Sequence, residues 1–78
     1  MMHAAYMLLL TEKGKAFSVA EKASKVKNVK AAHPVTGIYD VIVYIEAEKE
    51  LSESLKEIVE NIHSIDGVED TVTCIAVH

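Results

Sequence analysis

The hydrophobic and polar positions of this chain follow two spacings, one typical of helices and one typical of strands. Apolar residues recur at i, i+3, i+4 and i+7 over residues 15–27 and 49–64, which predicts two amphipathic helices. Alternating or β-branched apolar runs predict four strands, at residues 4–11, 29–36, 39–47 and 68–77. The predicted order of elements is therefore βαββαβ.

The two halves of the chain share one pattern of apolar positions. The segment Val26-Lys27-Asn28-Val29-Lys30 aligns with Ile65-Asp66-Gly67-Val68-Glu69 at an offset of 39 residues, and the helical positions before them align as well. Asn28 and Gly67 are residue types that tolerate a positive φ, which the backbone often adopts just after a helix ends. Each half is therefore predicted to run strand, helix, helix stop, strand.

Two βαβ units joined by a hairpin predict a ferredoxin-like fold of the α+β class, in a single domain spanning residues 1–78. In this fold the first and third strands lie at the centre of a four-stranded antiparallel sheet, and the second and fourth lie at its edges. Pro34 falls in the second strand, which agrees with the confinement of proline to edge strands. Both helices are expected to cover the same face of the sheet.

The face of the sheet without helices is predicted to be apolar as well. The two central strands are apolar on both faces: Ala5, Met7 and Leu9 alternate with Tyr6, Leu8 and Leu10, and Val41, Val43 and Ile45 alternate with Ile42 and Tyr44. An antiparallel sheet with one face in water normally places polar residues there. Hiding several such side chains is worth roughly 10 kcal/mol before association costs, at about 25 cal/mol per Å² of apolar area. The sequence thus predicts a homo-oligomer, most simply a twofold dimer whose sheets pack face to face.

Composition and charge exclude several classes of protein. Half of the residues are apolar, which argues against an intrinsically disordered chain. Eight lysines, no arginine and twelve carboxylates give a net charge of −4, the wrong sign for neutralising the phosphates of nucleic acid. No apolar run approaches the ~18 residues that cross a membrane, and residues 4–10 lack the flanks of a signal peptide. We therefore expect a cytoplasmic protein that binds neither nucleic acid nor membrane.

Candidate residues for catalysis or metal binding do not form a recognised pattern. Cys74 is the single cysteine, which excludes a disulfide framework and a cysteine-based zinc site. The histidines show no metal-ligand spacing; they are His3, His33, His63 and His78. No nucleophile–base pair, carboxylate dyad or phosphate-binding glycine loop can be assembled. We expect no catalytic residues, no metal and no cofactor.

The hairpin between the second and third strands carries the most suggestive group of residues. In the run Val35-Thr36-Gly37-Ile38-Tyr39-Asp40, the glycine can supply a turn conformation, and Asp40 can accept turn hydrogen bonds. The same carboxylate can instead receive a ligand ammonium, while backbone N–H groups near Gly37 receive a carboxylate. The physical chemistry of these residues favours the structural interpretation and leaves the amino-acid-binding one open.

Two hydroxyls on one face of the last strand form a weaker signal. Thr71 and Thr73 alternate with Val72 and Cys74, and threonine in a strand usually reflects β-propensity alone. At a sheet edge the two hydroxyls could also bind a small polar ligand.

Both segments together carry a family resemblance. The residues Val35-Thr36-Gly37-x-Tyr39-Asp40-Val41-Ile42 precede a terminal Ile65-Asp66-Gly67-Val68-x-x-Thr71-x-Thr73-x-Ile75. Over residues 4–77 the chain resembles the effector-binding domain of Lrp/AsnC-type transcriptional regulators, the RAM domain. The resemblance implies a non-enzymatic module that dimerises through its sheets, often forms octameric rings, and binds amino acids or related metabolites between dimers.

The resemblance also assigns expected roles to ligand-binding residues. Gly37 would offer backbone groups, Asp40 would hold the ligand's amino group, and Tyr39 would shape the pocket. Thr71 and Thr73 of an adjacent subunit would reach the ligand's polar ends. The helix-turn-helix domain that normally precedes the module does not occur in this sequence. We therefore expect a stand-alone RAM domain, which senses a metabolite alone or co-assembles with a full-length Lrp/AsnC-type regulator.

A small dimeric α+β barrel enzyme, similar to a monooxygenase or an isomerase, is the alternative of a different class. It would share the βαββαβ order and the sheet dimer, but it needs a polar cavity between sheet and helices. Both predicted helix stripes are aliphatic and the chain has no tryptophan, which favours the sensing module. The ACT domain, another amino-acid-sensing module of the same fold, would change the pocket and keep the class of function.

Overall fold

The elements follow the predicted order βαββαβ. The computed structural model describes residues 3–48 and 51–77, and the side chains of 51 and 52 are outside this description. The elements are β1 (His3–Thr11), α1 (Ala16–Ala23), β2 (Val29–Pro34), β3 (Val41–Ala47), α2 (Leu51–His63) and β4 (Val68–Ile75). The predicted ferredoxin-like α+β fold is confirmed.

Two elements are shorter than predicted at positions that matter for the site. The helix predicted over 15–27 ends at Ala23, because Lys25 and Val26 donate to carbonyls three residues back, at 3.2 and 3.1 Å, and so tighten the chain into turns. The strand predicted over 39–47 begins at Val41, because Val35 N–H donates to Asp40 C=O at 2.8 Å and closes the hairpin there. Tyr39 and Asp40 therefore belong to the connection.

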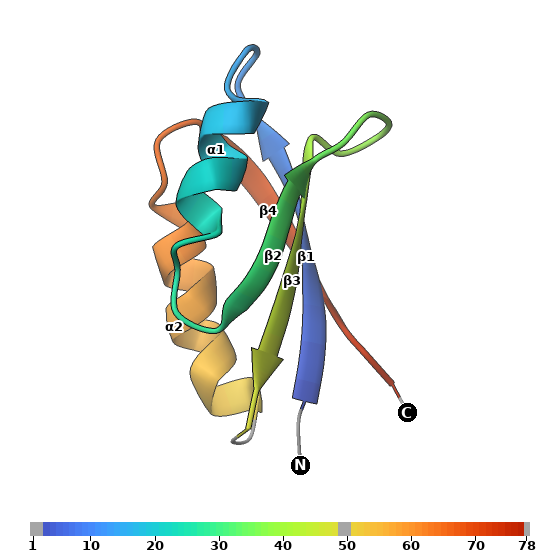
Figure 1. The fold of residues 1–78 in the computed structure, drawn as a ribbon, viewed down its shortest axis with the longest axis vertical. Helices are drawn as coiled ribbons and strands as arrows, with labels where there is room; N and C mark the ends of the chain where they lie inside the picture. Colours follow the sequence, from blue (N-terminus) through green and yellow to red (C-terminus); the bar gives the residue numbers. More distant parts are fainter. Residues whose placement is uncertain (1–2, 49–50, 78) are drawn as a thin grey trace.

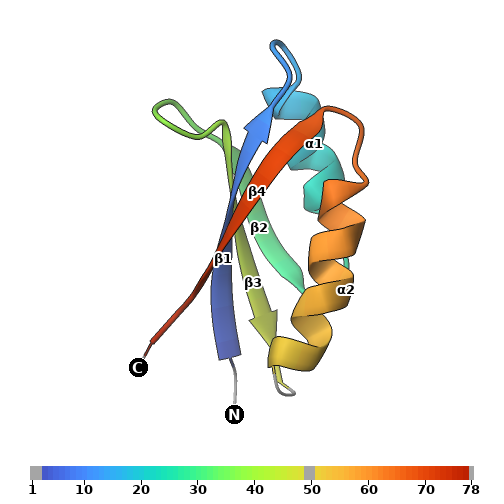
Figure 2. The same ribbon diagram turned by 180° about the vertical axis from the view of Figure 1, so that it is seen from behind.

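The sheet has the predicted antiparallel order β2-β3-β1-β4. The central strands are β1 and β3, and Pro34 ends the edge strand β2. Figures 1 and 2 show that α1 and α2 lie on one face of the sheet only, and that the 35–40 hairpin lies at the end opposite the chain termini. Among the described elements, no helix lies on the other face of the sheet.

The core lies between the two helices and the covered face of the sheet. Alternate residues of β1 and β3 point into it, as the period of two requires. The buried apolar residues are Ala5, Met7, Leu9, Val19, Ala20, Ala23, Val41, Val43, Ile45, Ala47, Ile58 and Ile62. The aliphatic stripes of both helices thus fill the space where a barrel enzyme would need a polar cavity.

The predicted repeat of the two halves is visible in the turns that follow the helices. Val29 N–H donates to Val26 C=O at 3.1 Å, and Val68 N–H donates to Ile65 C=O at the same distance. Asn28 has φ 74° and Gly67 has φ 101°, as expected for residues just after a helix. Glu12 N–H also donates to Gly67 C=O at 2.8 Å, which joins the β1–α1 turn to the α2–β4 turn.

The open face of the sheet, which we define as the face without helices, is apolar at its centre. Cross-strand partners share a face, so Tyr6 and Tyr44 lie together there, with ring centroids 5.0 Å apart. Tyr6 is 41% exposed and Val72 38%. The other apolar members are half-buried; they are Ala4, Leu8, Leu10 and Ile42. The predicted dimer would cover this face.

Candidate functional site

The predicted ligand site begins at the hairpin between β2 and β3. Asp40 N–H donates to Leu9 C=O at 2.9 Å, and its carboxylate Oδ2 accepts the Thr11 N–H at 2.9 Å. Asp40 therefore ties the hairpin to the end of β1, which agrees with the structural interpretation of this residue. A carboxylate has two oxygens and about four acceptor sites, so the half-buried Asp40 retains capacity for a further donor.

The hairpin tip presents its backbone to the surroundings. Gly37 has φ 129°, and a Cβ added there would meet no atom within 4 Å, so backbone conformation rather than space requires glycine. Its neighbour Ile38 is 87% exposed. Tyr39 is half-buried between the tip and Asp40. The structure thus brings Gly37, Tyr39 and Asp40 together in one loop.

Thr71 and Thr73 lie on the other side of β1 from this loop. They pair with Leu9 and Met7, whose side chains are buried under the helices, so both threonines point to the covered face at the sheet edge. Asp40 borders Leu9 from the β3 side, which leaves one strand, or roughly 10 Å, between the two groups. A single copy therefore does not unite the predicted site residues in one pocket.

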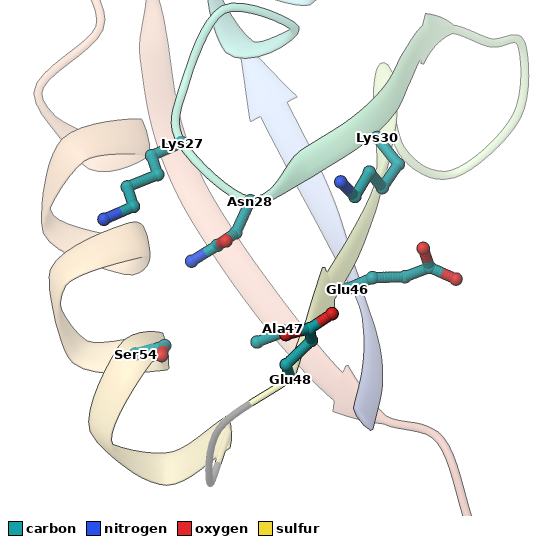
Figure 3. A pocket seen from close by; sticks show the side chains of 7 residues that line it. All are labelled: Lys27, Asn28, Lys30, Glu46, Ala47, Glu48 and Ser54. Carbon is teal, nitrogen blue, oxygen red and sulfur yellow. The ribbon is translucent and has the colours of Figure 1, made fainter. Parts of the chain in front are cut away.

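A groove lies at the opposite end of β2 and β3 from the hairpin. Its volume is about 350 Å³, and its lining residues are Lys27, Asn28, Lys30, Glu46, Ala47, Glu48 and Ser54 (Figure 3). A smaller hollow of about 70 Å³ shares three of them and continues along α2 to Glu57, Ile58 and Asn61. Sequence reasoning missed the groove because its residues come from three separate segments and form no motif.

One carboxylate of this groove also belongs to the open face. Tyr44 O–H donates to Glu46 Oε2 at 2.7 Å, and this hydrogen bond, more than the partial burial beside it, raises the pKa of Tyr44. Since Tyr44 is the partner of Tyr6, Glu46 connects the groove with the aromatic pair on the open face.

Within the described part of the chain, no three His, Cys, Asp or Glu side chains gather closely enough to hold a metal ion. None of the described helices has the length and apolar character needed to cross a membrane. Cys74 is exposed on β4, beside Tyr6 on the neighbouring strand.

The comparison with protein families tests the predicted resemblance. Residues 4–78 match the family model described as the Lrp/AsnC ligand binding domain. The chain belongs to this family. The predicted resemblance is thereby confirmed, and the match to this ligand-binding domain, together with a transcriptional regulator as a relative, supports a regulatory sensing module.

Individual relatives agree with this assignment. The chain is 35% identical over 71 residues to the HTH-type transcriptional regulator FL11 from Pyrococcus furiosus, a match that covers 91% of this chain and 46% of the regulator. The Lrp/AsnC domain therefore spans about half the length of that curated relative. A hypothetical protein from Pyrococcus horikoshii, PHS023, superposes with a TM-score of 0.82 at 35% identity over 100% of this chain and 92% of that one.

A more distant structure shares the fold of this Lrp/AsnC domain. A transcriptional regulator from Neisseria meningitidis, solved as a complex with L-Met, matches with a TM-score of 0.75 at 18% identity. The match covers 97% of this chain and 50% of the regulator.

Proposed function

We propose that this Lrp/AsnC domain senses an amino acid or a closely related metabolite, which it binds at a seam between copies of the chain. The observation that carries the proposal is the Asp40 carboxylate, anchored at one oxygen by Thr11 N–H beside an exposed glycine backbone. The L-Met complex of the Neisseria regulator, which has the same fold, supports this class of ligand.

The hairpin supplies groups for both charged ends of an amino acid. Asp40 accepts hydrogen bonds from the ligand ammonium, a charge-assisted contact stronger than a neutral one. Backbone N–H groups around Gly37 face the ligand carboxylate, and Tyr39 forms a wall of the pocket. Thr71 and Thr73 of a second copy complete the site, since within one copy a strand separates them from Asp40.

The open face is the surface through which copies associate in this proposal. Its centre is formed by Tyr6, Leu8, Ile42 and Tyr44, and polar residues occur towards its margins, with Asp70 paired to Leu10 and His33 paired to Ile42. An apolar centre with a polar rim is the usual anatomy of a protein interface. A second copy seated face to face would cover it. Because Thr71 and Thr73 point to the covered face, the copy that lends them belongs to a neighbouring dimer, with the dimers assembled into a ring.

Calorimetric titration of the twenty amino acids tests the ligand class. At least one of them should bind, and Asp40→Asn should weaken binding by about 1.5–3 kcal/mol, or roughly tenfold or more, because the charge is lost while the acceptor for Thr11 N–H is kept. Glu53→Gln, an exposed residue on α2, is the matched control for the change of charge. Absence of binding by all twenty, or equal binding by the Asp40 variant, would remove the assignment.

Light scattering tests the assembly. A mass of at least two copies is expected without ligand, and a change of mass on adding the bound amino acid would link sensing to assembly. A single copy at millimolar concentration would contradict the proposed seam.

A further inference from the structure

The groove at the far end of β2 and β3 has charged side chains of opposite sign on its walls. Lys27 and Lys30 extend from the α1–β2 turn and from β2, and Glu46 and Glu48 come from the end of β3 (Figure 3). The ion pairs within 4.0 Å among the described residues are Lys15–Glu12, Lys15–Asp66 and Lys25–Glu21. None of them crosses the groove, so its two walls do not neutralise each other by direct contact.

Neutral hydrogen-bonding groups lie between these walls. The Asn28 side chain reaches into the groove from above and Ser54 faces it from α2 (Figure 3). The floor is held in place by the Glu46 N–H, which donates to Asn28 C=O at 3.1 Å. Asn28 itself has φ 74°, a conformation that asparagine tolerates better than most residues, and this conformation sets the direction of its side chain.

A ligand that carries both an ammonium and a carboxylate would satisfy both walls. Its carboxylate would accept hydrogen bonds from Lys27 and the Asn28 amide, and its ammonium would donate to Glu48. A purely anionic ligand would meet the repulsion of Glu48, and a purely cationic one would meet that of Lys27. The volume of about 350 Å³ lies within the range of small-molecule sites, which is roughly 300–1,000 Å³.

We infer that this groove is a second binding site, formed within a single copy, for a small zwitterion such as a free amino acid or a dipeptide. The site lies at the opposite end of β2 and β3 from the hairpin, so it is separate from the site proposed above and does not require a seam between copies. The 70 Å³ hollow that continues along α2 offers room for the longer of the two ligands.

The groove also has a physical connection to the open face. Glu46 accepts the Tyr44 hydroxyl at 2.7 Å, and Tyr44 packs against Tyr6.

An amide-resolved NMR titration of the full chain tests this site. The probes are L-alanine and L-alanyl-L-alanine, and the matched controls are N-acetyl-L-alanyl-L-alanine and L-alanyl-L-alaninamide, each of which lacks one charge. Shifts are expected at residues 27–30, 46–48 and 54 with at least one probe and not with the controls. The probe that shifts them at lower concentration identifies the length of ligand that fits.

Variants separate this site from the hairpin. Lys27→Gln and Glu48→Gln should each weaken binding about tenfold through the loss of one charge-assisted contact, whereas Lys13→Gln and Glu69→Gln, exposed elsewhere, should not. Asp40→Asn should leave the shifts in the groove intact. No shift with either probe at millimolar concentration would overturn the inference. Shifts confined to residues 35–40, or equal binding by the Lys27 and Glu48 variants, would overturn it as well while leaving the hairpin proposal standing.

Discussion

The two faces of the sheet are built from neighbouring residues of the same strands, yet the helices of the chain cover only one of these faces. On the covered face Met7, Leu9 and Val43 are fully buried beneath the helices. On the open face, one residue along each strand, Leu8 and Ile42 remain half-buried and Tyr6 is 41% exposed. Leucine and other aliphatic residues occur in both sets, so their different exposure comes from the helices that cover only one face.

This difference distinguishes the apolar residues that are buried when the chain folds from those that remain available for assembly. Burial of the covered face requires only the elements of one chain, although β1 pairs with β3 and β4 from distant parts of the sequence. In the proposed assembly the open face is buried by another copy, and the candidate site likewise draws on two copies, because Asp40 and Thr71 lie on opposite sides of β1. The functional site is therefore expected to be complete only in an assembly of copies.

The largest expected effect is on the free energy of unfolding, and it comes from a cavity created under the helices. Leu9→Ala should lower the free energy of unfolding by about 3 kcal/mol, within the 2–5 kcal/mol typical of buried leucine, at every protein concentration. Leu8→Ala on the open face should cost less in the isolated chain, and its cost should grow with protein concentration as copies associate. Denaturant unfolding over a range of concentrations measures both. Equal losses at all concentrations would show that the two faces do not differ in this way.

A charge placed on the open face should separate the copies. Ile42→Asp should raise the dissociation constant of the proposed dimer about a hundredfold, or roughly 2.7 kcal/mol, because the carboxylate would be buried without a partner. Phe17→Asp is the control, since Phe17 is 79% exposed on α1, away from the open face. Sedimentation or light scattering gives the mass. A dimer that survives the Ile42 variant would place the interface elsewhere.

The fold could be predicted because each element carries its own local signal. Nearly continuous apolar runs in β1 and β3, aliphatic stripes in both helices, and Asn28 and Gly67 at the helix stops all indicate the same topology. The strand ends were less exact, since the closure of the hairpin at Val35 and Asp40 is a hydrogen bond between residues whose pairing no single-residue preference encodes.

The candidate sites differ in how far the sequence could reveal them. The hairpin residues are contiguous, so a motif could indicate them, although the hydrogen bond from Thr11 N–H to Asp40 required the structure. The groove combines residues 27–30, 46–48 and 54 from three segments that become neighbours only through packing. Sequence periodicity describes which face a residue lies on and carries no information on which charges face each other across a gap.

The helices that cover the core are held in place at the α2–β4 turn, and a smaller effect is expected there. In Gly67→Ala the new side chain would be attached to a backbone with φ 101°, and its Cβ would lie 3.1 Å from Lys15 Cβ and 3.2 Å from Val19 Cγ2. It should destabilise the fold by about 2 kcal/mol. Gly14→Ala, at φ 83° with open space around it, should cost only the conformational part, about 1 kcal/mol. Thermal unfolding of the two variants separates the steric contribution from the conformational one. Equal losses of stability would mean that Lys15 and Val19 move aside freely.

The smallest effect concerns the exposed ion pair beside that turn. Lys15 Nζ lies 2.8 Å from Asp66 Oδ2, and this hydrogen bond lowers the pKa of Asp66 and raises the pKa of Lys15. A carboxyl with a lowered pKa in the folded state contributes stability above its unfolded pKa, and that contribution is lost as the pH falls through the folded value. Lysine with a raised pKa contributes below its unfolded pKa and loses the contribution in strong alkali.

Asp66→Asn should therefore lower the melting temperature slightly at about pH 7, and the difference should shrink as the pH falls through the lowered pKa of Asp66 in the folded state. Because the pair is exposed, added salt should reduce the difference at neutral pH. Glu21→Gln, which removes the more distant pair with Lys25 at 3.8 Å, is the control and should have less effect still. A difference that persists unchanged in acid would mean that Asp66 acts through the backbone of the turn rather than through its charge. The covered face would then be held at this end by turn geometry alone.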